Sequence, residues 1–230
     1  MNYKHITGLL IFLAMFATPA FADMATFSAS QVTIIVNTEP NTSFSTLNGN
    51  IPDGDRVSID GFTDDYGDEF GVSQGLLRFT DFSIPLGSTI NSATLNFYTK
   101  SSTDGPVHFY QLLSNWDNTT TWNTFGGDGI TPGVEAAINP FASESDIADE
   151  TTLSVDATSL VTNWLTQDPF GIGIINPSED GWDFQIITDG HEFSPELIVD
   201  YTPVPLPAGA WLFLSGILGL IFKSRISTKD

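Results

Sequence analysis

The sequence predicts an all-β protein, an antiparallel jelly-roll-like β-sandwich of about nine short strands with one short helix. Short apolar runs with a period of two recur along the chain, separated by glycine, proline, asparagine and aspartate at intervals of about ten residues. Only one stretch has helical spacing. The chain is acidic, but its 18 phenylalanines and five tryptophans favour a packed core over disorder.

The strand predictions rest on apolar residues that alternate with residues of the opposite face. The runs are Val32/Ile34/Val36, Val57/Ile59, Leu77/Phe79, Ala93/Leu95/Phe97, Val107/Phe109, Leu153/Val155, Ile172/Ile174, Trp182/Phe184/Ile186 and Leu197/Val199/Tyr201. Half-buried sheets of this kind must bury their apolar faces against each other, which indicates a sandwich.

The predicted helix is short. Leu160, Val161, Trp164 and Leu165 follow helical spacing, and Thr158 or Ser159 precedes them as a candidate N-cap. Residues 139–152, acidic and rich in serine, are expected to form the longest irregular loop.

The N-terminus has the pattern of a secretory signal peptide. Lys4 and His5 precede the apolar run 6–17, and Ala20 and Ala22 complete an A-x-A cleavage site. We therefore expect signal peptidase to remove residues 1–22. The functional domain is then residues 23–203, long enough for one domain with a core.

The C-terminus has the pattern of a sorting signal. Val204-Pro205-Leu206-Pro207-Ala208 leads into an apolar stretch, 208–222, and then into Lys223 and Arg225. As a helix this stretch is about 22 Å long, short for a hydrocarbon core of about 30 Å. The basic residues after it predict a transmembrane segment with a cytoplasmic C-terminus.

This order of motif, apolar helix and basic tail resembles the PEP-CTERM class of bacterial sorting signals, in the variant that begins with VPLPA. All five letters match in residues 204–208. The resemblance implies processing by an exosortase and delivery to the cell surface or an exopolysaccharide matrix. The alternative is a plain single-pass membrane anchor.

Charge and cysteine content exclude several classes of partner. Residues 23–203 contain 27 of the 28 acidic residues and three of the seven lysines and arginines, which gives a formal charge of −24. Such a domain repels nucleic acid, anionic lipid and, with less force, anionic polysaccharide. The absence of cysteine excludes disulfides and thiolate metal sites.

Several motifs in a fixed order carry a second resemblance. They are Gly75-Leu76-Leu77-Arg78-Phe79, Ile90-Asn91-Ser92-Ala93-Thr94-Leu95, Trp116 with Thr121-Trp122-Asn123, Val155-Asp156-Ala157-Thr158 with Val161 and Trp164, Gly171-Ile172, and Pro195-Glu196-Leu197-Ile198-Val199-Asp200-Tyr201. Over most of residues 31–202 the chain resembles a DNRLRE-type domain. The resemblance implies a β-sandwich related to carbohydrate-binding modules, on secreted or cell-wall proteins and without catalysis. The sequence departs from the family at residues 41–44 and in the long acidic insert 60–69.

Aspartates form the candidate metal ligands. The densest group comprises Asp53, Asp55, Asp60, Asp64, Asp65 and Asp68, and hard oxygen ligands of this kind suit Ca²⁺. The alternative is a solvated acidic loop. A second, sparser group comprises Asp180, Asp183, Asp189 and Glu192.

Aromatic residues are the candidate ligand contacts. We expect Tyr66, Trp182 and His191 to be exposed beside loop carboxylates that accept hydrogen bonds from sugar hydroxyls. Trp116, Trp122 and Trp164 are expected to be structural. Arg78, a cation in an apolar strand, is expected to be buried and paired with Asp156.

Two functions remain open. The sequence favours a non-catalytic, exported protein of the cell surface or extracellular matrix, with a carbohydrate-binding-like sandwich. The alternative is a secreted polysaccharide-active enzyme, a hydrolase or lyase. Residues 71–75 match G-x-S-x-G, but a strand follows the serine where a nucleophile elbow needs a helix.

Overall fold

The computed structural model describes residues 21–45, 56–61, 71–178, 180–186 and 194–204. Contacts between Cα atoms divide the chain into two units. One is Ala22–Pro203, and the other consists of Met1–Phe21 and Val204–Asp230. The architecture below is that of the first unit.

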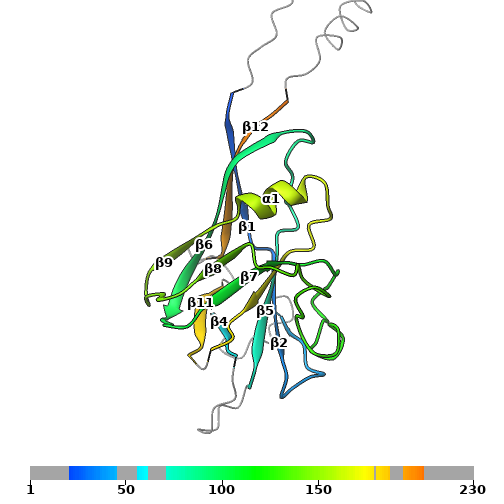
Figure 1. Cartoon of the computed structure of the whole chain (residues 1–230), viewed down its shortest axis with the longest axis vertical. Helices are drawn as coiled ribbons and strands as arrows, with labels where there is room; N and C mark the ends of the chain where they lie inside the picture. Colours follow the sequence, from blue (N-terminus) through cyan, green and yellow to red (C-terminus); the bar gives the residue numbers. More distant parts are fainter. Residues whose placement is uncertain (1–20, 46–55, 62–70, 179, 187–193, 205–230) are drawn as a thin grey trace, which may run out of the picture. The chain divides into compact units, whose positions relative to one another are not determined.

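Two sheets of six strands each, antiparallel in every pairing, make up this unit (Figure 1). In the first sheet the strand order is β1 (Asp23–Ser28), β12 (Glu196–Thr202), β6 (Thr89–Ser101), β11 (Trp182–Gln185) and β4 (Arg56–Ile59), and β9 (Thr152–Asp156) also pairs with β6. In the second sheet the order is β3 (Phe44–Ser45), β2 (Gln31–Val36), β5 (Ser73–Arg78), β10 (Ile172–Ile175), β7 (Val107–Gln111) and β8 (Ala142–Glu144). The predicted all-β class is confirmed.

The main core lies between the two sheets. Its centre is aromatic: Phe97 packs edge-on against Trp182 and Phe184, with ring centroids 5.3 and 5.0 Å apart, and Phe109 lies 5.5 Å from Phe97. These side chains are essentially inaccessible to solvent, as the period-two pattern predicts for inward-facing positions.

The single helix of the described residues, α1 (Thr158–Trp164), adds Leu160, Val161 and Trp164 to this core. Its N-cap is Ala157, which has no side-chain oxygen, so the predicted cap at Thr158 or Ser159 is wrong. The Asp156 carboxylate accepts a hydrogen bond from the Thr158 N–H at 2.9 Å instead.

A second, smaller core lies on the outer side of the second sheet. Residues 112–141, without a named strand or helix, place Trp116, Phe125 and Ile130 against Ile35 and Leu76 of that sheet. This segment, rather than 139–152, is the longest irregular segment in the described part. It is ordered by the apolar side chains that it buries.

The signal peptide and the transmembrane segment stay predictions. Residues 1–20 and 205–230 lie outside the described residues, and among those that are described no helix is long and apolar enough to cross a membrane.

Candidate functional site

The outer faces of the two sheets differ in what lies over them. On the second sheet Ile35, Leu76 and Tyr110 point outward, and residues 112–141 bury them. A hydrogen bond also joins this covering segment to the sheet: the Gln74 side-chain oxygen accepts from the Ile130 N–H at 2.6 Å. We call this surface the covered face.

The outer side of the first sheet is accessible to solvent. Along β6, Ala93, Leu95, Phe97 and Thr99 are buried, whereas Thr94, Asn96, Tyr98 and Lys100 are half-buried. We define the open face as the outward residues of β4, β11, β6 and β9 together with Glu150: Arg56, Ser58, Asp183, Asn96, Tyr98, Lys100 and Ser154. It contains two of the three cations found between residues 23 and 203.

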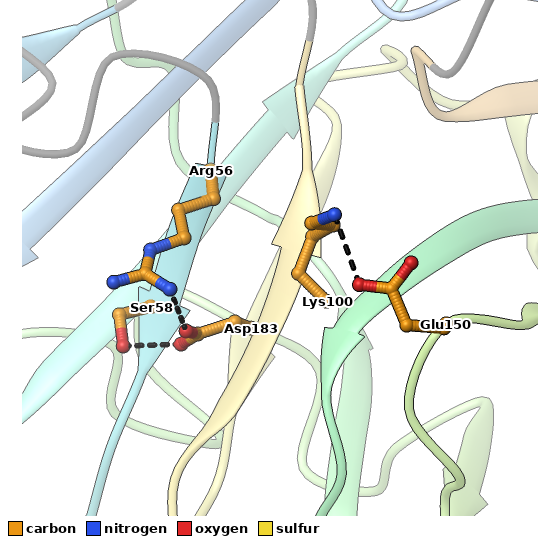
Figure 2. A network of polar contacts seen from close by, with 5 residues as sticks. All are labelled: Arg56, Ser58, Lys100, Glu150 and Asp183. Carbon is orange, nitrogen blue, oxygen red and sulfur yellow. Dashed lines mark hydrogen bonds and ion pairs between the residues drawn. The ribbon is translucent and has the colours of Figure 1, made fainter.

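Asp183 of β11 joins two side chains of β4 on the open face (Figure 2). Its Oδ2 lies 3.5 Å from Nη1 of Arg56, and its Oδ1 accepts a hydrogen bond from the Ser58 hydroxyl at 2.5 Å. The Asp183 side chain is 13% exposed and that of Arg56 43% exposed. The carboxylate is therefore held in one orientation while the guanidinium keeps contact with water.

A second polar group contains Lys100, Tyr98 and Glu150. The Lys100 ammonium donates to Glu150 Oε1 at 3.0 Å, the Tyr98 hydroxyl donates to Oε2 at 2.9 Å, and the ammonium lies 5.7 Å from the Tyr98 ring centroid. The hydrogen bond from Lys100 lowers the pKa of Glu150, with a further contribution from Tyr98. The bond to Glu150 raises the pKa of Tyr98.

The Asp183 group and the Glu150 group each present hydrogen-bond donors and acceptors, and their positive and negative charges balance. Each cation of the open face has a carboxylate partner, and Asn96 accepts a hydrogen bond from Ser154 at 2.8 Å. A surface of this kind suits a ligand rich in hydroxyl groups, and the Tyr98 ring adds an apolar plane.

The structure corrects the expectation for Trp182. Its side chain is fully buried in the aromatic core, where it contacts Phe97, Phe109 and Phe184, so it cannot contact a ligand. The alternation of Trp182, Phe184 and Ile186 already indicated that these residues share one face of the strand, and that face points into the core. Tyr66 and His191 lie outside the described residues.

The structure also corrects the partner of Arg78. Its Nη2 donates to the Asn115 side-chain oxygen at 2.9 Å, its Nε donates to the Phe170 carbonyl at 3.3 Å, and its guanidinium lies 4.6 Å from the Trp116 ring centroid. Partial burial lowers the pKa of Arg78, and nearby Asp117 opposes this. Arg78 ends β5 in the second sheet, whereas Asp156 ends β9 in the first sheet.

The other tryptophans named from the sequence lie in the cores. Trp116 and Trp164 are buried, and half-buried Trp122 packs against the second core. The Trp116 indole N–H donates to the Phe170 carbonyl at 2.7 Å, so Trp116 and Arg78 share one acceptor.

Of the six candidate calcium ligands, the structure describes only Asp60; Asp53, Asp55, Asp64, Asp65 and Asp68 lie outside the described residues. Asp60 follows β4, and its backbone pairs with Ser73.

In the second acidic group Asp180 and Asp183 have structural partners, whereas Asp189 and Glu192 lie outside the described residues. Asp183 pairs with Arg56, and an Asp180 side-chain oxygen accepts a hydrogen bond from the Asp104 N–H at 2.6 Å. Within the described ranges no three histidine, aspartate or glutamate side chains converge as metal ligands. A calcium site in the acidic segments stays a prediction.

Of the expected processing residues, Ala22 and Val204 are described and exposed, whereas Ala20, Pro205, Leu206, Pro207, Ala208, Lys223 and Arg225 lie outside the described residues. β1 begins at Asp23 and β12 ends at Thr202. Asp23 is paired with Tyr201, so the domain begins and ends on adjacent strands at one end of the first sheet.

Sequence reasoning missed the open face and one further pair. Arg56, Lys100 and Tyr98 were visible as outward residues of predicted strands, but only the strand order brings them to one surface. His108 and Ser143 face each other across β7 and β8, with His108 Nδ1 2.8 Å from the serine hydroxyl.

Comparison with known proteins found no matching protein-family model and no matching curated protein.

Proposed function

We propose that this chain is a non-catalytic, exported protein of the bacterial cell surface or extracellular matrix, sorted by an exosortase, whose sandwich binds polysaccharide through the open face. The observation that carries the proposal is the difference between the two outer faces. The protein's own chain buries one, and the other is left accessible with an ordered array of polar side chains.

The chemistry of the open face favours a neutral polysaccharide. Arg56 and Lys100 are paired with Asp183 and Glu150, and the domain has a formal charge of −24, so an anionic chain would meet repulsion without an unpaired cation to offset it. Sugar hydroxyls can both donate to the carboxylates and accept from the cations and Ser58. Tyr98 provides a ring for the apolar face of a sugar.

The arrangement of the chain ends supports surface display. Asp23 directly follows the expected signal cleavage site, and Thr202 stands two residues before the first residue of the expected sorting motif. Both ends of the domain therefore lie at one end of the first sheet, next to the expected processing sites.

The described carboxyl groups give no support to the enzyme alternative. Glycoside hydrolysis needs a carboxylic acid whose pKa is raised so that it stays protonated. The described carboxyl groups with shifted pKa values, Asp117, Glu150 and Asp156, are all shifted downward by hydrogen bonds. His108 of β7 contacts Ser143 of the edge strand β8 through Nδ1, but no described acid orients the ring.

A glycan array with the full chain in detergent and millimolar Ca²⁺ tests the proposal. We expect neutral polysaccharides among the hits, and a reducing-end assay on each hit should detect no cleavage. Tyr98→Ala and Arg56→Ala should weaken binding, whereas Ser143→Ala, an exposed change on the second sheet, should leave it unchanged. Cleavage of a hit would indicate the enzyme, and binding insensitive to both open-face variants would place the site elsewhere.

A further inference from the structure

The outer edge of β1 is open. β1 pairs with β12, and within the described part of the chain no strand pairs with its other side. The Ala29 N–H donates to the Pro195 carbonyl on the β12 side. Since backbone groups alternate in direction along a strand, those of Met24, Thr26 and Ser28 point to the open side. The Asp23 carboxylate accepts from the Met24 N–H at 2.9 Å.

This edge lacks the features that usually prevent strand pairing. Natural sheets protect their edges with short strands, lysine, proline or bulges. The edge strands β3 and β8 have two and three residues, whereas β1 has six, with one charge at its first residue and no proline or lysine. Its register with β12 is unbroken over all six pairs. Met24 is 69% exposed.

We propose that β1 is a homophilic docking edge, where β1 of a second copy of this chain pairs antiparallel about a two-fold axis at Thr26. With the open-side residues Met24, Thr26 and Ser28 forming the hydrogen-bonded pairs, the register with greatest overlap sets Thr26 opposite its counterpart and Met24 opposite Ser28. It provides about four backbone hydrogen bonds directly, and two more once the Met24 N–H of each copy leaves the Asp23 carboxylate.

The charges of β1 fit a second copy in this register. Asp23, the only charged residue of the strand, lies opposite Ala29 of the other chain, so like charges do not meet directly. A Thr–Thr cross-strand pair occupies the axis, which is favourable in sheets. The formal charge of −24 on each copy still opposes association at long range, so dimerisation should strengthen with ionic strength.

Antiparallel pairing also fixes the direction of the two copies. The C-terminal ends of the two β12 strands then point in opposite directions, because each β12 is antiparallel to its own β1. Resting on the proposed surface anchoring, we expect this contact to join chains in a matrix, where two copies can take opposite directions.

A single cysteine tests the register, since the chain contains none. In a hydrogen-bonded antiparallel pair the opposed Cα atoms lie about 5.5 Å apart, within disulfide range. The full chain in detergent with Thr26→Cys should oxidise to a covalent dimer at least about tenfold faster than Ser92→Cys, owing to its higher effective concentration. Ser92 is exposed on β6 of the same sheet, away from the β1 edge.

Sedimentation provides the second measurement. The full chain should show a monomer–dimer equilibrium that shifts toward dimer between low and high salt, and Thr26→Pro, which removes an outward N–H, should abolish it. Circular dichroism checks that this variant is folded; if it is not, the comparison of cysteine variants decides. Equal oxidation rates at Thr26 and Ser92, or a wild-type chain that is monomeric at high salt, would overturn the proposal. Glycan binding is measured separately, so failure of the dimerisation proposal can be distinguished from failure of the proposed glycan binding.

Discussion

The strands β2 and β6 belong to different sheets and differ in how many of their faces are buried. All six residues of β2 are buried, whereas β6 alternates between buried and half-buried residues over most of its length. The sequence carries this difference: Gln31–Val36 is nearly continuous in apolar and β-branched residues, and β6 alternates. A sheet covered on both faces can use apolar side chains on both, and a sheet open on one face needs polar side chains there.

Removing the cover should have the largest effect. Trp116→Ala deletes a buried ring, its hydrogen bond to Phe170 and the surface on which Arg78 stacks. We expect a loss of about 3–5 kcal/mol in the free energy of unfolding, measured by urea denaturation. Trp122→Ala is the matched control: Trp122 is half-buried on the same segment and should cost less. Equal losses of stability in the two variants would mean that burial of apolar area does not hold residues 112–141 on the sheet.

Arg78 tests how firmly the cover is joined to the sheet. Its side chain is partly exposed and makes two hydrogen bonds and a stacking contact, without a buried ion pair. Arg78→Ala should therefore cost about 1–2 kcal/mol, below the 3–5 kcal/mol typical of breaking a buried pair. Arg78→Lys should recover only part of this. A loss above that range in denaturation would indicate a stronger partner.

Asp156 tests the support of α1 at the end of the first sheet. Asp156→Ala removes the acceptor for the Thr158 N–H and should cost about 1 kcal/mol. Hydrogen bonding lowers the pKa of Asp156 in the folded state. Its contribution is therefore present above the unfolded pKa of about 3.9 and lost as pH falls through the folded value. Wild type and variant should converge in acid; a difference that persists at low pH would argue against the ionised carboxylate.

The smallest effects should be on the open face, where the groups are exposed. Glu150→Gln weakens the hydrogen-bond acceptor that raises the pKa of Tyr98 and removes its charge, so phenolate absorbance should appear at lower pH than in the wild type. The melting temperature should stay the same, because exposed pairs contribute little to stability. Tyr110, whose pKa is raised by burial, titrates as an internal control in the same spectra. An unchanged titration would mean that Tyr98 and Glu150 are not in contact in solution.

Much of the fold could be predicted from the sequence, because alternation is a local property. The nine predicted runs correspond to β2, β4, β5, β6, β7, β9, β10, β11 and β12. The strands β1, β3 and β8 were missed because they are short or bury few apolar residues: in β1 only Phe27 is buried. The covering segment was missed because its apolar residues follow no period.

The candidate site was less predictable, since it depends on which strands are neighbours. Arg56 and Asp183 are far apart in sequence and meet because β4 pairs with β11. Trp182 precedes Asp183 on β11, so its side chain points to the opposite face, into the core, as the alternating run indicates. Arg78 contacts Asn115 and Trp116 because residues 112–141 fold back over the end of β5, which no local pattern reveals. It contacts Phe170 because that residue precedes β10, the strand paired with β5.

The position of β12 determines how the domain would respond to a pulling force. β12 leads directly to residue 204 and is paired with β1 over six residue pairs and with β6 over seven. A force along its axis, from an anchor beyond Thr202 to a ligand on the open face, loads both ladders in shear, so many hydrogen bonds must break together. A strand peeled from an edge would lose them one at a time. The expected anchor is thus joined to β12, which lies between β1 and β6 and is paired with both. We therefore expect the domain to resist unfolding under a pulling force.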